Sequence, residues 1–395
     1  MVGRALLDAP RKALITSPYS ALERWLHWIA LQPSAVRHLA FDLERAAYLP
    51  DNPAQAALGP VYVCGLARSG TTILLRLLDE VEVLKSLSYR DMPFVLAPNL
   101  WRAAHGERQR NVAKTMRAHK DGLFVDLDSP EGLEEVFWHT FGHTVPDTTA
   151  RTLSYHPPSP DTLAAFADYR ALVANPKGSV AAPGALPRRY LSKNNNNLMR
   201  LASLCADPSA HVLLAYRDPL ATARSLHRQH QRFCKAQAGD RFVRRYMGWL
   251  AHYDFGLDHL PFAFARPHMA PGLQSDDPNY WLDYWCAVHQ HILQQQAHNL
   301  HLINYDTLCA QPARVLGQVF NTLELQADAT ALSKLVRAAP PSNAAPTKPP
   351  HPEQRTSEST DVLPAPPTEF SPALLQRAHT MHAALRASGC NIISD

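Results

Sequence analysis

Residues 61–76 have the pattern of a buried strand that turns through a glycine-containing loop into a helix. Four apolar residues, Val-Tyr-Val-Cys, come first, and an apolar run with helical spacing follows Thr72. Between them, Gly65 and Gly70 have the spacing of the glycines in a Walker A loop. Such loops hold a phosphate-like anion with successive backbone N–H groups and the N-terminus of the helix. The sequence therefore predicts an anion cradle here.

The cation of this loop is not where a P-loop NTPase carries its lysine. Thr71 occupies that position, and Arg68 lies three residues before it. This placement argues against ordinary ATP or GTP hydrolysis. A guanidinium group offers a forked set of donors to an anion, so Arg68 still suits a phosphate-like ligand. The alternative interpretation is a helix-capping loop that binds nothing.

A second strand followed directly by a helix is predicted over residues 211–226. Asp218 is a natural N-cap and Pro219 a natural first helical residue. Arg217 then projects from the carboxyl end of the strand, and Ser225 lies about two turns into the helix. Taken alone, an arginine at a strand end is more often part of a surface ion pair.

Together, the two units resemble the donor site of sulfotransferases, which use 3′-phosphoadenosine 5′-phosphosulfate (PAPS) and release 3′,5′-diphosphoadenosine (PAP). The resemblance is most specific over residues 60–94 and 189–227, and its motifs are closest to tyrosylprotein, carbohydrate-type and bacterial members. It implies that the first loop binds the 5′-phosphosulfate and that the second unit binds the 3′-phosphate. The implied donor-binding residues are Gly65, Arg68, Ser69, Gly70, Thr71, Thr72, Arg217 and Ser225.

A third matching segment lies at residues 190–200. In tyrosylprotein and carbohydrate sulfotransferases, a lysine at this distance before the 3′-phosphate arginine contacts the sulfuryl group, and Lys193 matches it. The family usually has a proline nearby, where this chain has four asparagines, 194–197. Asn194 and Asn197 are the candidates for ligand contacts. The alternative is that the asparagines form a loop and a helix cap.

Sulfotransferases also need a general base for the acceptor hydroxyl. In several members a carboxylate lies just over twenty residues after the loop cation, and Asp91 falls in that window. The resemblance thus implies Asp91, Lys193 and Arg68 as the catalytic residues. A cap before Pro93 is the alternative role for Asp91. The rival bases are Glu134, Glu135, His139 and His227.

The hydrophobic pattern predicts short strands separated by helical segments. The strands are expected at residues 60–64, 83–88, 189–192, 212–216 and 300–305. This alternation predicts an α/β fold with a mainly parallel sheet of P-loop type, helices on both faces and the ligand at the carboxyl ends of the strands. Arg68, Asp91, Lys193 and Arg217 all follow such ends. Residues 300–308 also resemble the late strand of the family, which ends in an aromatic-acidic pair.

Residues 1–58 are predicted to form an N-terminal helical layer, and residues 59–395 the sulfotransferase domain. Residues 95–188 and 230–278 are longer than a crossover needs and are expected to form helical insertions that cap the acceptor. The segment 340–361 begins rich in proline and is expected to be a lid or linker, with Lys348 and Arg355 available to the donor.

Within the first insertion, residues 128–141 have the pattern of a capped amphipathic helix. Its apolar face is expected to pack into the core. Glu134, Glu135 and His139 are expected on its solvated face. The apolar residues are Leu133, Val136, Phe137 and Phe141.

Composition limits the remaining possibilities. The chain has 395 residues, 46% of them hydrophobic, which is enough for a large core. Six cysteines without close pairing predict free thiols, and no apolar stretch is long enough to span a membrane, so a cytoplasmic enzyme is expected. The net charge of +4 is modest and does not indicate nucleic-acid binding. No metal is expected, because the sequence lacks a His/Cys ligand cluster or a Walker B carboxylate.

The expected activity is sulfuryl transfer from PAPS to an acceptor hydroxyl by in-line displacement with a carboxylate base. The acceptor is expected to be a small molecule, a carbohydrate or a peptide. The alternatives are a small-molecule kinase that uses Mg-ATP and a nucleotide-binding protein without catalysis. Thr71 argues against the kinase. The joint presence of Arg68, Lys193, Arg217 and Ser225 argues against the second alternative.

Overall fold

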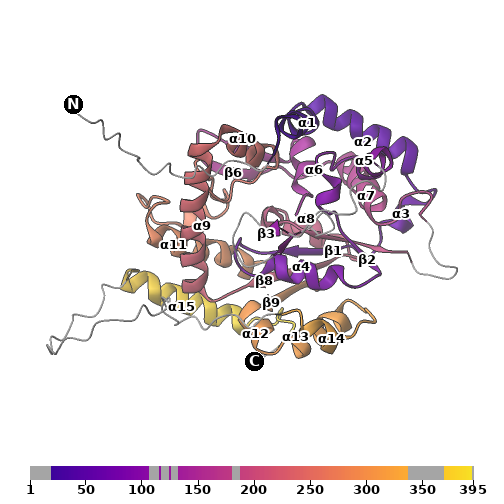
Figure 1. Cartoon of the computed structure of the whole chain (residues 1–395). Helices are drawn as coiled ribbons and strands as arrows, with labels where there is room; N and C mark the ends of the chain where they lie inside the picture. Colours follow the sequence, from indigo (N-terminus) through magenta and orange to yellow (C-terminus); the bar gives the residue numbers. More distant parts are fainter. Residues whose placement is uncertain are drawn as a thin grey trace, which may run out of the picture.

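The computed structural model is organised around one five-stranded parallel sheet (Figure 1). It describes residues 19–105, 115–116, 124–125, 132–179, 187–336 and 369–393. The strand order is β2-β7-β1-β8-β9, so the first strand of the cradle motif is central. The bounds of these strands are Leu84–Lys85 (β2), Arg189–Lys193 (β7), Val61–Cys64 (β1), His211–Tyr216 (β8) and Leu300–Asn304 (β9). The predicted α/β fold with a mainly parallel sheet is confirmed.

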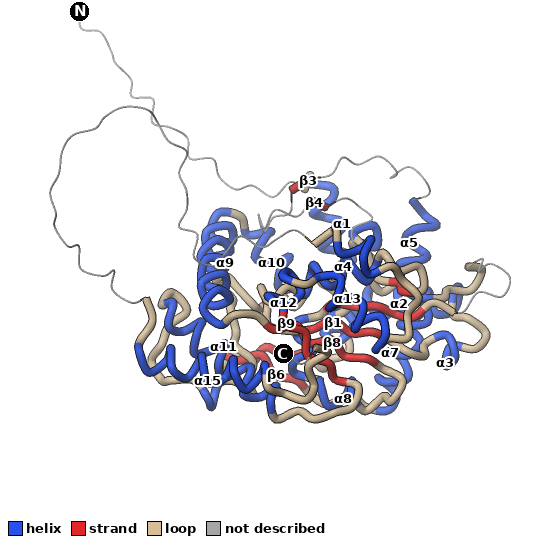
Figure 2. The backbone as a smooth tube through the Cα atoms, turned by 90° about the horizontal axis from the view of Figure 1, so that it is seen from below, coloured by secondary structure: helices blue, strands red, loops and turns tan. Residues whose placement is uncertain are grey.

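Helices surround this sheet, and in Figure 2 the strands run through the middle of the molecule with helices around them. The helices that precede β8 are α1 (Ala21–Leu31), α2 (Ser34–Tyr48), α3 (Pro53–Ala56), α4 (Thr71–Asp79), α5 (Pro98–His105), α6 (Glu135–Thr140), α7 (Pro160–Ala174) and α8 (Leu201–Cys205). Those that follow β8 are α9 (Pro219–Gly239), α10 (Arg241–Trp249), α11 (Pro278–Leu293), α12 (Tyr305–Ala310), α13 (Pro312–Thr322), α14 (Ala329–Ser333) and α15 (Pro372–Arg386). Two small antiparallel pairs join β3 (Thr115–Met116) to β4 (Phe124–Val125) and β5 (Thr144–Asp147) to β6 (Thr152–Tyr155).

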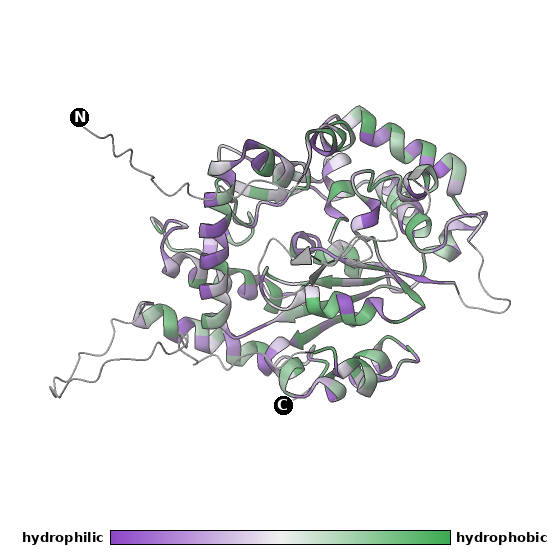
Figure 3. Cartoon of the chain, in the orientation of Figure 1, coloured by the Kyte–Doolittle hydropathy of each residue, from purple (hydrophilic) through white to green (hydrophobic). Residues whose placement is uncertain are grey.

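The sheet is buried on both faces because its central strands, β1 and β8, are almost entirely apolar. Side chains alternate between the two faces of a strand. On β1, Val61 and Val63 join the cluster made with α4 and α13, whereas Tyr62 and Cys64 join the larger cluster made with α7 and α11. All four are at most 1% exposed. The central strands accordingly carry the hydrophobic colour in Figure 3.

The five predicted strands of the sheet are all present, with small differences at their ends. The largest difference is at residues 83–88, where only Leu84 and Lys85 pair with β7. The chain then enters a 3-10 turn at Tyr89–Asp91. β2 is an edge strand, with β7 as its one neighbour in the sheet.

The amphipathic helix predicted at residues 128–141 differs more. Among the described residues it begins at Glu135 and ends at Thr140, as α6. Leu133, Val136 and Phe137 are buried as predicted. The expectation that Glu134 and Glu135 are solvated is wrong, since each is only 1% exposed. The helix is covered on both sides, so its polar residues need partners inside the protein.

The N-terminal helices α1 and α2 are present, and α1 begins with a capping box made by Ser20 and Glu23. From α2, the buried Glu44 accepts hydrogen bonds from the N–H groups of Asn99 and Leu100, which ties α2 to α5. The domain limits stay a prediction. The proposed lid at 340–361, with Lys348 and Arg355, lies outside the described residues.

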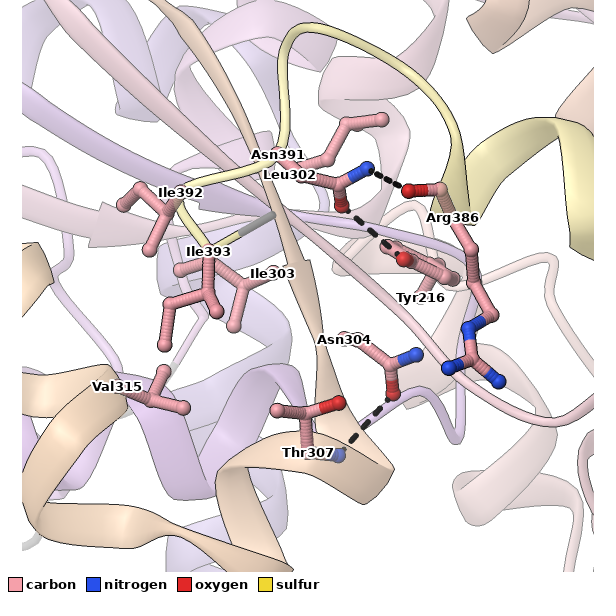
Figure 4. A pocket seen from close by; sticks show the side chains of 10 residues that line it. All are labelled: Tyr216, Leu302, Ile303, Asn304, Thr307, Val315, Arg386, Asn391, Ile392 and Ile393. Carbon is pink, nitrogen blue, oxygen red and sulfur yellow. Dashed lines mark hydrogen bonds between the residues drawn. The ribbon is translucent and has the colours of Figure 1, made fainter. Parts of the chain in front are cut away.

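The C-terminal segment covers the outer edge of β9. Leu302 exchanges backbone hydrogen bonds with Cys390 and Ile392, at 2.8 and 3.0 Å. Figure 4 shows Asn391 beside this edge, where its side chain accepts from the Tyr216 hydroxyl at 3.0 Å and donates to the carbonyl of Arg386. The strand edge that a sheet would otherwise expose is therefore paired.

All six cysteines are free, as predicted. Within the part of the chain that the structure describes, no helix combines the length and the hydropathy needed to cross a membrane.

Acid should destabilise this fold through His289, which is fully buried on α11. Burial lowers the pKa of His289 from the ordinary 6.5 to about 3. The folded chain therefore keeps the imidazole neutral at pH 5, whereas the unfolded chain binds a proton below about pH 6.5. The stability linked to this group is complete above pH 6.5 and is lost as the pH falls towards 3.

We expect His289→Gln to remove about 2 kcal/mol of the difference in unfolding free energy between pH 7 and pH 5, measured by urea unfolding. His298→Gln is the control, because His298 is exposed. An unchanged pH dependence in His289→Gln would contradict the neutral buried state.

Candidate active site

The loop between β1 and α4 is tight because its backbone takes positive φ angles. They are +148° at Gly65, +72° at Arg68 and +95° at Gly70. A Cβ at Gly65 would lie 2.4 Å from the carbonyl oxygen of Ala215 on β8, so only glycine fits there. The loop thus closes against the neighbouring strand and leaves the N-terminus of α4 at the carboxyl edge of the sheet, where it favours an anion.

Ser69 stabilises this loop from inside. Its side chain is fully buried, and its N–H and hydroxyl both donate to the Leu66 carbonyl, at 3.2 and 2.6 Å. These bonds fix the shape of the loop. The contact of Ser69 with the donor, which the resemblance implies, stays a prediction.

The two motifs that the sequence analysis singled out meet directly. The Nε of Arg68 donates to the hydroxyl of Ser225 on α9, at 3.0 Å. These residues are 157 positions apart in the chain. The helix that carries Ser225 begins as predicted, with Pro219 in its first turn and the Asp218 side chain accepting from the N–H of Ala221.

Arg217 lies between β8 and the start of α12. Its guanidinium carbon is 5.1 Å from the centre of the Tyr305 ring, and its Nε is 3.6 Å from Asp306. Asp306 also accepts from the N–H of Asp218, at 2.8 Å. The Tyr305 ring covers Gly70 so closely that a Cβ there would lie 2.1 Å from the ring. Tyr305 therefore touches both the cradle loop and the second motif.

Lys193 ends β7 directly beside the central strand, in register with Val63. Of the asparagines that follow it, Asn195 reaches the cradle, where its Oδ1 accepts from the Thr71 hydroxyl at 3.4 Å. Asn194 and Asn197, the expected ligand contacts, are buried and bonded to other protein groups. Asn194 caps the following 3-10 turn, as the alternative interpretation had it.

Asp91 lies in the 3-10 turn that follows β2 and is completely buried. It accepts hydrogen bonds from the N–H of Ser88, at 2.7 Å, and from the guanidinium of Arg102, at 2.9 Å. Asp91 therefore has the alternative role that the sequence analysis gave it, that of a cap. This turn follows β2, which pairs with β7, the strand that ends at Lys193.

The rival bases are all engaged or buried. Glu135 forms an ion pair with Arg200 at 2.9 Å, and Glu134 accepts from several neutral donors. The Nε2 of His227 lies 2.8 Å from the carbonyl oxygen of Asp276. Burial lowers the pKa of His139 below its ordinary value of 6.5.

No group of three or more His, Cys, Asp or Glu side chains is arranged to hold a metal ion among the residues that the structure describes. The expectation that the reaction needs no metal stays a prediction.

Sequence reasoning missed two contacts of the site. Asn195 was not singled out among four identical residues. Tyr305 was noted only as part of a strand that resembles the family, although an aromatic residue directly after a strand was a usable signal. The glycine at position 70 did not indicate which side chain would lie against it.

The resemblance implies that this loop binds PAP, and Gly70→Ala should then weaken that binding strongly. The new methyl group would overlap the Tyr305 ring and also meet an unfavourable φ, so the loop and the ring must separate. We expect the Kd for PAP to rise at least about 100-fold in calorimetric titration, which corresponds to about 3 kcal/mol.

Gly178→Ala is the matched control. Gly178 also has a positive φ, +84°, but nothing lies within 4 Å of a Cβ there. It should bind PAP like the parent protein. Parental affinity in Gly70→Ala would show that the close contact is not needed.

Residues 60–271, more than half of the chain, match the model of the sulfotransferase family. Three solved structures are similar to the chain. STF1, a sulfotransferase from Mycobacterium tuberculosis H37Rv, is 15% identical over 78% of each chain, with a TM-score of 0.44. STF9 from Mycobacterium avium is 16% identical over 81% of this chain and 78% of its own, with a TM-score of 0.43.

The sulfotransferase domain from the curacin biosynthetic pathway is 18% identical over 70% of this chain and 76% of its own, with a TM-score of 0.32. No curated protein matches the sequence. On the strength of the family match, which includes the cradle loop, Lys193, Arg217 and Ser225, the chain belongs to the sulfotransferase family.

Proposed function

We propose that this protein transfers the sulfuryl group of PAPS to an acceptor hydroxyl. The observation that carries the proposal is the hydrogen bond from Arg68 to Ser225, because it joins an anion cradle to a second cation-bearing motif at one edge of the sheet. PAPS carries a phosphate at the 3′ position of its ribose and a phosphosulfate at the 5′ position. A site with two neighbouring anion subsites suits that ligand.

The donor would lie across the carboxyl ends of β1 and β8. Loop amides, Thr71 and Thr72 would hold the 5′-phosphate at the N-terminus of α4. Arg217 and Ser225 would hold the 3′-phosphate with charge-assisted hydrogen bonds. The positive φ of Gly65 and Gly70, and the closeness of their neighbours, support this use of the loop.

The reaction requires in-line displacement at sulfur. A bond forms between the acceptor oxygen and sulfur while the bond between sulfur and the bridging oxygen of the donor breaks, and PAP leaves. Arg68 and Lys193 would stabilise the charge on the sulfuryl oxygens and on the departing oxygen. Holding the two reactants in line supplies much of the rate enhancement.

The acceptor hydroxyl must lose its proton as the new bond forms, and we propose Asp91 as the base. Its position in the turn that follows β2, the neighbour of the strand that ends at Lys193, supports this role. Its contacts with Ser88 and Arg102 also make it a cap, and the two roles are separable by experiment.

The donor assignment is tested by titrating the protein with PAP and, separately, with Mg-ATP. PAP should bind without added metal, and Arg217→Ala should weaken it about 10- to 100-fold, as expected for losing a charged hydrogen-bond donor. Arg228→Ala is the control, because Arg228 is exposed on the same helix as Ser225. Preference for Mg-ATP would instead support a kinase.

Asp91→Asn tests the base. A base assignment predicts that release of PAP in the presence of an accepted hydroxyl compound slows at least about 100-fold while PAP affinity stays parental. A cap alone predicts that turnover is kept and that any loss is confined to the unfolding free energy, because asparagine also has an acceptor oxygen. Parental turnover by Asp91→Asn would remove Asp91 from the mechanism.

A further inference from the structure

We infer that Glu134 is the residue that positions Lys193 for transfer, although it does not touch the donor itself. The inference rests on the proposed function, in which Lys193 contacts the sulfuryl group. It comes from a buried carboxylate that neither the cradle nor the base assignment uses.

Glu134 bonds to both residues that flank Lys193 in the chain. The Ser192 hydroxyl donates to its Oε2, and the Asn194 side-chain amide donates to its Oε1 at 3.3 Å. Residues two apart in an extended strand project to the same side, and the residue between them projects to the other. Two anchors on one side therefore fix the strand end from which Lys193 projects.

The chain just before Glu134 also passes against Lys193. At Gly132, a Cβ would lie 2.5 Å from the carbonyl oxygen of Lys193 and 3.0 Å from its Cδ. Only a residue without a side chain allows this approach. Residues 132–134 thus contact the lysine itself and both of its neighbours.

The chemistry of Glu134 is unusual for a residue that only fills space. It is 1% exposed, and its other partners are the Trp138 indole N–H at 2.9 Å and the Tyr190 hydroxyl at 3.1 Å. All four of its donors are neutral. A buried carboxylate is costly unless such donors surround it, and an apolar side chain would pack here without that cost. What Glu134 provides is a fixed orientation of the Ser192 and Asn194 side chains.

Glu135, next to Glu134 in the chain, holds Asn194 more firmly. Asn194 donates to Glu135 at 2.6 Å, and Glu135 receives two hydrogen bonds from Arg200, each at 2.9 Å. Arg200 is 1% exposed. The side-chain amide of Asn194 is therefore held between two carboxylates, one of which is neutralised by a buried arginine.

Rigid placement matters because transfer depends on alignment more than on affinity. A displacement of about 1 Å in a catalytic group can cost about 100-fold in rate. The 3′-phosphate and the 5′-phosphate are held by other elements, so a shifted lysine should leave their binding intact.

The test is Glu134→Gln, which keeps the shape of the side chain but places an NH₂ group against donors. The probes are PAP for binding and PAPS for turnover, with release of PAP as the readout. The sulfuryl group passes to an accepted hydroxyl, which gives the sulfate ester and one proton, or to water, which gives sulfate and two protons. We expect kcat to fall 10- to 100-fold, with the PAP Kd and the donor KM within threefold of the parental values.

Glu44→Gln is the matched control. Glu44 is also a fully buried carboxylate held by three N–H donors, but it joins α2 to α5. It should lose stability without a selective fall in kcat. Should Glu134→Gln not fold, Ser192→Ala removes one anchor alone and should lower kcat in the same direction.

A double-mutant cycle separates positioning from general damage. If Glu134 acts through Lys193, adding Glu134→Gln to Lys193→Ala should cause little further loss of kcat. Additive losses, or a Glu134→Gln protein that behaves like Glu44→Gln, would overturn the inference. Failure of the parental protein to bind PAP would instead overturn the proposed function, so the two failures are distinguishable.

Discussion

The site depends on the lack of a side chain at Gly65 and at Gly70. The first absence lets the cradle loop close against the Ala215 carbonyl, two residues before Arg217 leaves the sheet. The second lets the Tyr305 ring lie on the loop while it also contacts Arg217. Three segments far apart in the chain therefore meet at one edge of the sheet. The contact between Arg68 and Ser225 is a consequence of that convergence.

The features that sequence predicts well are those with a local cause. The run Val-Tyr-Val-Cys is apolar at every position, which is typical of a strand buried on both faces, and β1 is such a strand. Asp218 and Pro219 together specify the start of α9 without help from the rest of the fold. Because the carboxyl ends of parallel strands share one edge, the placement of both motifs at that edge also followed from the predicted strands.

The features that the sequence predicts poorly depend on residues that are far away in the chain. Helical periodicity placed Glu134 and Glu135 on the face opposite the apolar residues, but periodicity does not tell what lies against that face. Their partners Tyr190 and Arg200 are 56 and 65 residues away. Likewise, four identical asparagines gave no local signal that Asn195 would reach Thr71 while Asn194 and Asn197 turned inward.

The arrangement of charges shows how cations can be gathered before an anion arrives. Arg68, Lys193 and Arg217 all lie at one sheet edge, and like charges at such a site repel unless something offsets them. Two different kinds of carboxylate lie nearby. Asp306 is 43% exposed and 3.6 Å from Arg217, so water screens that pair. Glu134 is buried and bonded on four sides to residues that include both neighbours of Lys193. In the proposed function, the exposed pair would open for an incoming phosphate, whereas the buried carboxylate would keep the strand end of Lys193 in place.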